Sequence, residues 1–274
     1  MTETKYAVVF DLDETLGAFS QPYRFWYYLK KYLRDDDLDD KYFFNFLDLF
    51  PEFIRTNLFS LLKNLREKKK NRLCNNVMIY TNNNGPTFWV DLIKSYFNKK
   101  LKYPLFDQII RAYKIGKERI ELCRNSDVKS YRDFVTCTKL PGNTRLIFID
   151  DKLHEGMIHK NVRYVHIKPY HYTVDYSILA QKFYNANKKL FADNRTIKDF
   201  IHFFNVNTSY DKLEHSNKSK TEKNIDYMFS KQTEKVIEEF FSKPKRSITS
   251  TNRNPTRKSK RPSTRRTTKT RVSI

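Results

Sequence analysis

The sequence predicts an α/β protein with a Rossmann-like core, in which helices cover a central parallel sheet. Three short apolar runs indicate buried strands, because they contain β-branched and aromatic residues and are too short for helices. They span residues 6–10, 77–80 and 145–149. Each run ends abruptly on acidic or hydroxyl side chains, and stretches with helical spacing separate the runs. This alternation is typical of parallel strands joined by helical crossovers.

The stretch between the first two strands is expected to be helical. Residues 17–50 read as a small helical insertion, with helices over 21–33 and 42–50. Pro51 suits the first turn of a third helix, whose core-facing stripe includes Leu58, Leu61 and Leu65. The acidic run over residues 35–40 is interpreted as a cap of the second helix, where negative charge is favoured. A metal-binding loop is the alternative for that run.

Further helices and strands are expected to alternate between the second and third strands. A tight turn over residues 82–85 leads into a helix that starts at Pro86. Residues 106–111 read as a strand, residues 113–124 as a hairpin or a lid near the site, and residues 128–138 as a helix. After the strand that ends at Asp150, the last core strand is expected over residues 162–167.

The C-terminal third of the chain is expected to form helices followed by an unfolded tail. We expect a core over residues 1–190, a helical extension over 191–242 and a disordered basic tail over 243–274. Helices are expected over 179–191 and 197–206, a linker over 216–224, and one amphipathic helix from Ile225 to Phe241. The tail holds twelve Lys or Arg residues and no acid. Such a composition buries too little apolar surface to fold.

Two carboxylates follow the first strand at positions i and i+2, in the run Asp11-Leu12-Asp13-Glu14-Thr15. Alternate residues of a strand share a face, so both carboxylates turn the same way as the chain leaves the sheet. Open α/β sheets bind ligands beyond the carboxyl ends of their strands. Two like charges side by side repel, so the site needs a cation, a base or a shared proton.

This Asp-x-Asp-x-Thr run resembles the first motif of the haloacid dehalogenase (HAD) superfamily of aspartate-nucleophile phosphatases. Three further features follow in the family's order, namely Thr81 after the second strand, a lysine, and the pair Asp150-Asp151 after the third. The form Asp-Leu-Asp-Glu-Thr-Leu is similar to the branch of phosphatases, NLI-interacting-factor-like, that act on the C-terminal domain of RNA polymerase II. Low glycine with abundant Lys, Asn, Tyr and Phe also resembles proteins of large DNA viruses.

The resemblance implies magnesium-dependent hydrolysis of phosphate monoesters through an aspartyl-phosphate. Asp11 would be the nucleophile, and Asp13 the general acid and base. Thr81, Asn82 and Lys139 would bind phosphate. The implied ligands of Mg²⁺ are Asp11, the backbone carbonyl of Asp13, and Asp150 or Asp151. Related chains often carry Asp-Asn at this last pair, so the choice between Asp150 and Asp151 stays open.

The phosphate-binding lysine and the nearby histidines also leave alternatives. Lys139 lies shortly before the third strand and is preferred, while Lys114 and Lys117 lie in the same interval. His154 and His159 follow the last motif, where contact with substrate is weighed against a solvated or core position, and the latter is preferred.

The composition and the cysteines bear on partners and compartment. The 53 Lys and Arg residues against 31 Asp and Glu give a net charge of +22, which favours polyanionic partners. No apolar run of eighteen residues predicts a transmembrane helix. The N-terminus is polar. Cys74, Cys123 and Cys137 show no Cys-x-x-Cys spacing, so each is expected to be a reduced, small buried hydrophobe that holds no structural zinc. These features predict an intracellular protein, nuclear or cytoplasmic, or in a viral factory, and not a secreted one.

Three functions are therefore compared. A protein phosphoserine or phosphothreonine phosphatase is preferred, because a short insertion leaves the site open to a macromolecule. A nucleic-acid end phosphatase is the first alternative, since the positive charge would attract such a substrate. The second alternative is a non-catalytic nucleic-acid-binding protein on a phosphatase fold. The basic tail fits a nuclear-import signal and a non-specific nucleic-acid-binding arm equally well. A solvating extension is the third alternative, and the oligomeric state is left open.

Overall fold

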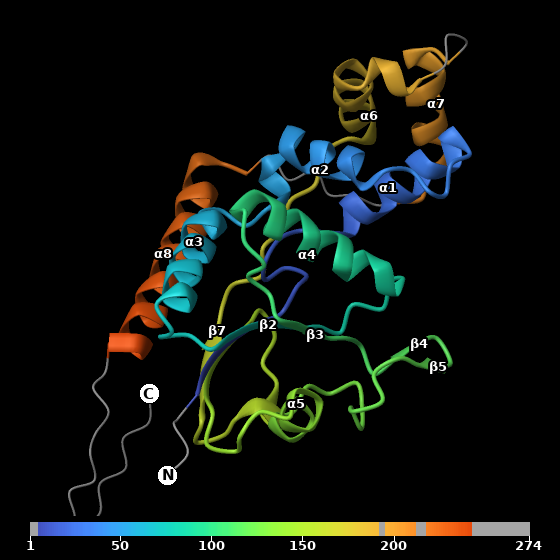
Figure 1. Ribbon diagram of the computed structural model, residues 1–274. Helices are drawn as coiled ribbons and strands as arrows, with labels where there is room; N and C mark the ends of the chain where they lie inside the picture. The colour runs from blue at the N-terminus through green and yellow to red at the C-terminus, as the bar shows by residue number, and fades with distance from the viewer. Residues whose placement is uncertain (1–4, 192–194, 212–217, 243–274) are drawn as a thin grey trace, which may run out of the picture. The chain divides into compact units, whose positions relative to one another are not determined.

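In the computed structural model, which describes residues 5–191, 195–211 and 218–242, five parallel strands form a central sheet. The order of the strands is β3-β2-β1-β6-β7. Their bounds are β1 Tyr6–Phe10, β2 Asn76–Tyr80, β3 Gln108–Ile110, β6 Arg145–Asp150 and β7 Val162–His166. The α/β class with a parallel sheet, predicted from the apolar runs, is confirmed, and the arrangement is Rossmann-like (Figure 1).

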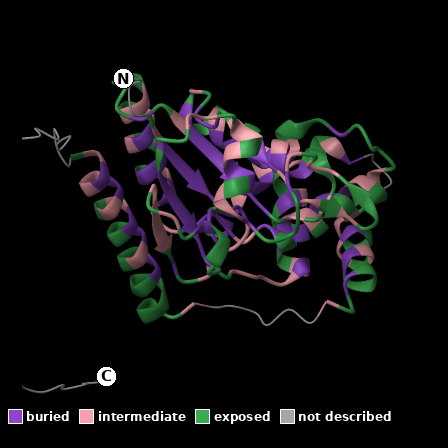
Figure 2. Cartoon of the chain, turned by 90° about the horizontal axis from the view of Figure 1, so that it is seen from below, coloured by how far each residue is buried: buried purple, intermediate pink, exposed green. Residues whose placement is uncertain are grey.

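Successive side chains of the strands pack into two separate cores, one on each face of the sheet. Val8, Phe10 and Ile79 belong to the larger core, while Val9 and Tyr80 belong to the smaller one. The alternation follows from the two-residue period of a strand. Since both faces of the inner strands are covered, β1, β2 and β6 read as continuous apolar runs. These three strands are buried except at their first residues, whereas the edge strand β7 is only half-buried (Figure 2).

Three helices pack on the face of the sheet that carries the larger core, and one short helix packs on the other face. The three are α3 (Leu58–Lys70), α4 (Thr87–Leu101) and α8 (Lys220–Ser242), and the short one is α5 (Tyr131–Thr138). In Figure 1 they lie on opposite sides of the sheet. Helix α8 packs against α3 and keeps its other side exposed (Figure 2). The amphipathic helix expected from residue 225 thus exists, but it begins at Lys220, inside the predicted linker.

Four helices form a layer beyond the carboxyl edge of the sheet. Helices α1 (Ser20–Leu33) and α2 (Asp40–Leu49) come from the predicted insertion, and α6 (Tyr176–Ala186) and α7 (Ile197–Asn207) come from later in the chain. Helix α7 contacts both α6 and α1, and α2 contacts α6 (Figure 1). The described residues up to Ser242 form one compact unit. The expected boundary at residue 190 therefore falls between two helices that pack together, not between two units.

Several local expectations need correction. Pro51 opens a short 3-10 helix, η1 (Pro51–Phe53), and α3 begins only at Leu58, because residues 54–57 leave helical geometry. Asp39 caps α2 by accepting a hydrogen bond from the Lys41 backbone N–H, as the acidic run predicted. The helix expected to reach Phe191 ends at Ala186 and is followed by a 3-10 turn, η3 (Lys188–Leu190).

The remaining elements are small. Strands β4 (Lys114–Ile115) and β5 (Glu118–Arg119) form the antiparallel hairpin that was one of the two expectations for this segment. A 3-10 turn, η2 (Glu155–Met157), precedes β7. Among the described residues, no helix is long and apolar enough to cross a membrane. The predicted basic tail, residues 243–274, lies outside the described residues.

Candidate active site

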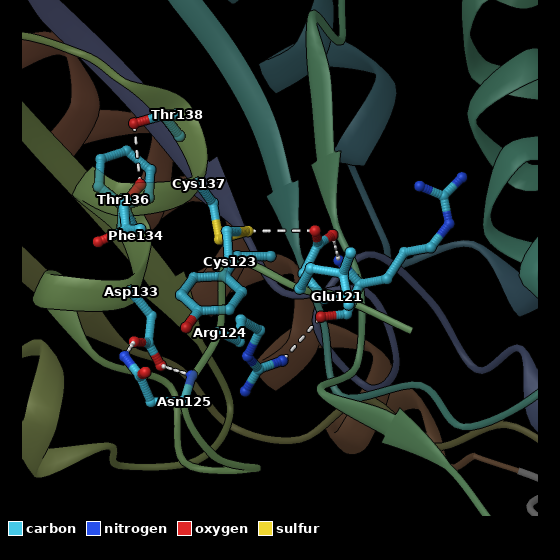
Figure 3. Close-up of a disulfide and its surroundings, with 12 residues drawn as sticks. Glu121, Cys123, Arg124, Asn125, Asp133, Phe134, Thr136, Cys137 and Thr138 are labelled. Carbon is cyan, nitrogen blue, oxygen red and sulfur yellow. Dashed lines mark hydrogen bonds between the residues drawn. A yellow bond between two sulfur atoms is a disulfide. The ribbon is translucent and has the colours of Figure 1, made fainter. Parts of the chain in front are cut away.

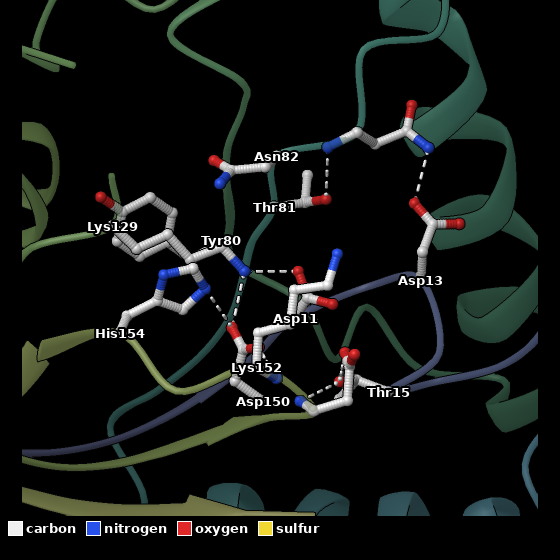
Figure 4. Close-up of polar contacts among 12 residues, drawn as sticks. Asp11, Asp13, Thr15, Tyr80, Thr81, Asn82, Lys129, Asp150, Lys152 and His154 are labelled. Atoms are coloured by element: carbon white, nitrogen blue, oxygen red, sulfur yellow. Dashed lines mark hydrogen bonds and ion pairs between the residues drawn. The ribbon is translucent and has the colours of Figure 1, made fainter. Parts of the chain in front are cut away.

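The sheet brings together the polar residues that follow three neighbouring strands. Strand β1 lies between β2 and β6, and all three run parallel. Asp11 follows β1, Thr81 follows β2, and Asp150 ends β6. The Asp11 backbone N–H donates to the Ile149 carbonyl at 2.9 Å, which continues the ladder one residue beyond the strand. The three side chains therefore meet at the carboxyl edge of the sheet, as the motif order predicted (Figure 4).

Lys129 binds two of the carboxylates in this cluster. Its Nζ lies 2.5 Å from Asp11 Oδ1 and 2.7 Å from Asp150 Oδ2. The lysine side chain is 2% exposed. Buried carboxylates are costly unless they are paired and hydrogen-bonded, so this ammonium group compensates two charges that would otherwise repel (Figure 4).

The neighbouring charges act differently on the two carboxyl groups. Burial raises the pKa of Asp11, with Asp150 adding to the increase, while Lys129 opposes it. Burial also tends to raise the pKa of Asp150, but hydrogen bonds with His154 and Lys129 outweigh it and hold that pKa below its ordinary value. Asp150 is thus held as a carboxylate, whereas Asp11 depends on positive charge nearby to stay ionised.

Asp13 accepts its side-chain hydrogen bond from an amide, whereas Asp11 and Asp150 accept theirs from Lys129. Asn83 Nδ2 donates to Asp13 Oδ2 at 2.7 Å, and the Asn83 backbone N–H donates to Thr81 Oγ1 at 2.9 Å. The other oxygen, Asp13 Oδ1, is buried and has no hydrogen-bond partner among the described residues. Burial raises the pKa of Asp13, the Asn83 hydrogen bond lowers it, and Glu14 raises it further, with a net increase. Part of the Asp13 population is then protonated at higher pH than for an ordinary aspartate.

Asp151 offers one oxygen to a neighbour and keeps the other free. Thr15 Oγ1 donates to Asp151 Oδ1 at 3.0 Å and accepts from the Asp151 backbone N–H at 3.1 Å. Asp151 Oδ2 is buried without a partner in the described part of the chain. Carboxylate oxygens of Asp11, Asp150 and Asp151 lie within 4.8 Å of one another. A buried group of oxygen ligands with an orphaned oxygen fits a hard cation such as Mg²⁺.

The loop that carries Asp13 is braced by a buried arginine. Arg55 donates from Nε to the Thr15 carbonyl at 2.6 Å and from Nη2 to the Glu14 carbonyl at 2.5 Å. Glu14 has a φ of 60°, which is costly for a residue with a side chain, so these bonds hold a strained turn. Gly17 closes the turn, where a Cβ atom would collide with the Phe53 carbonyl oxygen.

The structure does not bring Lys139 to the site. Lys139 caps the carboxyl end of α5 with a φ of 54° and is exposed. Lys114, one alternative, lies 3.7 Å from Asp127 in an exposed pair, and Lys117 is exposed in the turn of the hairpin. The lysine expectation is therefore corrected to Lys129, which lies at the other end of α5.

Lys129 was missed although the sequence holds a signal for it. Ser130 and Asp133 form a helix-start pattern, and Ser130 Oγ accepts from the Asp133 backbone N–H at 3.1 Å. A helix that returns from one parallel strand to the next begins at the carboxyl edge of the sheet, where the site lies. A lysine directly before the cap is placed at that edge, and a lysine after the helix is not.

Other polar residues near the site take supporting positions. Asn82 is exposed and donates from Nδ2 to the Asp127 carbonyl at 2.8 Å, which ties the end of β2 to the segment that precedes Lys129. His154 Nε2 lies 3.5 Å from Asp150 Oδ2, so this histidine contacts the carboxylate cluster. His159 instead stacks on Tyr131, with ring centroids 3.9 Å apart.

Two of the three cysteines form a disulfide, which corrects the expectation of free thiols. Cys123 and Cys137 are joined, while Cys74 is buried and free. No paired spacing indicates this bond, because Cys123 lies in the segment after β5 and Cys137 in the last turn of α5, 14 residues further along the chain (Figure 3). The next residue, Arg124, is fully buried and donates to the Thr81 and Arg111 carbonyls at 3.3 and 2.8 Å. The disulfide thus borders the framework of the site.

Comparison with known proteins supplies no relative for this chain. No family model, no curated protein and no solved structure matches it.

Proposed function

We propose that the protein hydrolyses phosphate monoesters through a covalent intermediate on Asp11, with Mg²⁺ as its cofactor. The observation that carries the proposal is the pairing of Lys129 with Asp11 and Asp150 beside an Asp13 carboxyl group that stands apart. Two carboxyl groups in different environments can serve as a nucleophile and as a proton donor. The motif order shared with HAD phosphatases supports the same assignment.

In the first half of the reaction, a carboxylate oxygen of Asp11 attacks phosphorus, and the bond from phosphorus to the ester oxygen breaks. We assign the attack to Oδ2, because Oδ1 is bound to Lys129. Asp13 gives its proton to the leaving oxygen, a role that its raised pKa favours. The ammonium group of Lys129 offsets negative charge on the transferring phosphoryl group, and the Thr81 hydroxyl group binds one phosphoryl oxygen.

In the second half, water attacks the phosphorus atom of the aspartyl-phosphate. Asp13, now a carboxylate, takes a proton from that water, and the bond between phosphorus and Asp11 breaks to release inorganic phosphate. Splitting the reaction in this way replaces one slow step by two easier ones. Asp13 returns to its protonated form and Asp11 to its ionised form, so the residues are ready for another turnover.

The orphaned oxygen favours Asp151 over Asp150 as a direct metal ligand. Asp150 already accepts hydrogen bonds from Lys129 and from the Lys152 backbone N–H, whereas Asp151 Oδ2 has no partner in the part of the chain described. Bound Mg²⁺ would supply positive charge to Asp11 and phosphate. Asp11, Asp151 and, by resemblance, the Asp13 carbonyl would hold it, and Asp150 would orient Lys129.

The decisive experiment compares Asp11→Asn with the unaltered protein on an aryl phosphate in the presence of Mg²⁺. The amide is nearly isosteric but cannot attack phosphorus, so turnover should fall to background. Asp36→Asn, an exposed change in the loop after α1, carries the same change in charge and should keep full activity. Turnover retained by Asp11→Asn would exclude the covalent mechanism, and full activity in excess chelator would exclude the metal.

A protein substrate remains the preferred class, since the insertion over residues 17–50 contributes only α1 and α2 to the helical layer. A nucleic-acid end remains the alternative. The basic segment 243–274 is proposed, on composition alone, to bind nucleic acid without sequence preference. A chain ended at Ser242 should keep its turnover of aryl phosphate and lose most of its affinity for duplex DNA. Undiminished DNA binding would place the basic surface within residues 1–242.

A further inference from the structure

A cavity of about 310 Å³ opens beside Asp13. Its walls come from the loop after β1, the start of α1, the segment 170–173 after β7, and residues 210–211 after α7. This volume is at the small end of the range for ligand pockets, about 300–1,000 Å³. It suits one or two amino-acid side chains better than a large ligand.

The cavity lies on the leaving-group side of the proposed reaction. Asp13 and Glu14 line it, whereas Asp11, Thr81 and Lys129 do not. Phosphorus is bound between Asp11 and Lys129 in the proposed mechanism, and the ester oxygen is protonated by Asp13. The part of the substrate attached to that oxygen therefore extends past Asp13 into this cavity.

The charges of the cavity are opposite in sign to those of the chain. The acidic residues Asp13, Glu14 and Asp211 line it, against one guanidinium group, that of Arg24. Arg24 forms an ion pair with Asp211, and Asp13 holds a proton when substrate binds in the proposed mechanism, so Glu14 supplies the uncompensated negative charge. His171 lies 3.7 Å from Glu14. Asp13 Oδ1 is buried and unpartnered among the described residues. An acidic cavity in a chain of net charge +22 shows that global charge does not describe this site.

Aromatic side chains supply the rest of the lining. Tyr170 is buried, Tyr172 is half-buried, and Tyr210 is 93% exposed at the rim. The methylene stems of Lys and Arg pack on apolar faces while their charged ends seek acceptors, and their cations interact favourably with aromatic faces. Carboxylates beside tyrosines therefore match a basic side chain.

We propose that this cavity receives a basic residue next to the phosphorylated Ser or Thr of a peptide, and that it disfavours nucleic-acid ends. The inference rests on the proposed phosphatase function. In an oligonucleotide, the group beside a terminal phosphate is a nucleoside joined to a charged phosphodiester. That second negative charge would approach Glu14 and Asp211, and like charges brought together oppose binding. A Lys or Arg at the same place meets opposite charge.

The test compares matched substrates. One peptide has the sequence of residues 256–262 of this chain, Thr-Arg-Lys-Ser-Lys-Arg-Pro, phosphorylated at the position of Ser259. Its partners carry Ala or Glu in place of the four basic residues, and 3′- and 5′-phosphorylated oligonucleotides complete the set. Exposed ion pairs are weak, so we expect kcat/KM to be about five- to tenfold higher for the basic than for the Ala peptide at low salt. The Glu peptide and both oligonucleotides should be poorer still.

Asp211→Asn tests the cavity itself. The change removes one carboxylate and releases Arg24 from its ion pair, so the preference for the basic peptide should shrink by about threefold or more. The effect is measured as the ratio of kcat/KM for the basic peptide to kcat/KM for the Ala peptide, because this ratio cancels any general loss of turnover. Asp36→Asn has the same change in net charge outside the cavity and should keep the preference. Raising the salt concentration should reduce the preference of the unaltered protein.

The outcomes separate this inference from the function on which it rests. No turnover of aryl phosphate with Mg²⁺ would overturn the proposed function. Turnover of aryl phosphate with equal kcat/KM for the basic, Ala and Glu peptides would overturn only the inference. Oligonucleotide ends preferred over every peptide would also overturn it and would favour the end phosphatase. A peptide preference that survives Asp211→Asn unchanged would place the selective surface elsewhere.

Discussion

Helix α5 carries a lysine just beyond each of its ends, and the two lysines have different surroundings. Lys129 precedes the cap residue Ser130 and is buried between Asp11 and Asp150. Lys139 is the last cap residue and is exposed. Because α5 returns the chain from β3 to the parallel strand β6, its start lies at the carboxyl edge of the sheet and its end toward the opposite edge. Whether a lysine can reach the carboxylates depends on the edge of the sheet at which it lies, and less on its distance from a motif along the sequence.

The largest effect is expected from removing the two lysines in turn. Lys129→Met should lower kcat for an aryl phosphate by about 10²–10³-fold, the usual loss when one preorganised charge partner is removed. Lys139→Met should stay within about twofold. Removing one partner of a buried ion pair also costs about 3–5 kcal/mol, so activity is compared at a temperature where circular dichroism shows both variants folded. Equal losses for the two variants would refute the assignment of Lys129.

The second effect concerns the disulfide, which joins the last turn of α5 to the segment after the hairpin. It closes a loop that contains Lys129, and closing about 15 residues stabilises a protein by about 3 kcal/mol. Reductant should lower the free energy of unfolding by this amount in urea titrations. Cys137→Ser should show the loss without reductant and no further change with it. Cys74→Ala should respond to reductant as the unaltered protein does, and an absent response there would argue against the pairing.

The third effect compares the two caps of α5. Ser130→Ala removes the side-chain acceptor for the Asp133 backbone N–H and should cost about 1 kcal/mol of stability. Lys139→Gly relieves a left-handed residue but adds freedom to the unfolded chain, so the free energy of unfolding should change by less than about 0.5 kcal/mol. Thermal melts of both variants measure the difference. A larger loss from Lys139→Gly would mean that the exposed end has contacts of its own.

A further effect is a pH dependence at the buried end of α5. Tyr80 accepts a hydrogen bond from the Ser130 backbone N–H at 3.2 Å, and burial raises its pKa to about 12. The unfolded chain loses this proton near pH 10 and the folded protein near pH 12. The stabilisation is therefore complete below pH 10 and decreases as the pH rises toward 12. Urea midpoints at pH 9 and 11 should fall less for Tyr80→Phe than for the unaltered protein, and parallel losses would contradict the assignment.

Local patterns along the chain were sufficient to predict the strands that form the framework of the site. The apolar runs of β1, β2 and β6 are short and continuous, and both faces of these strands are buried. The acidic and hydroxyl residues that end these runs, including Asp11, Thr81 and Asp150, could be assigned to one edge because parallel strands share their direction. Helix starts were less certain, as Pro51 shows, since a proline fits a 3-10 turn as well as an α-helix.

Contacts between distant segments decided the rest. The pair of Lys129 with Asp11 joins residues 118 positions apart, and no local period reports such a pair. The direction of α5 could have excluded Lys139 from sequence alone, but only the packed structure shows which lysine reaches the carboxylates. Contacts between distant segments also produce the disulfide and the acidic cavity beside Asp13. They likewise bring α6 and α7 against α1 and α2. Secondary structure follows from neighbours in the chain, whereas ion pairs, disulfides and cavity walls depend on how the elements pack.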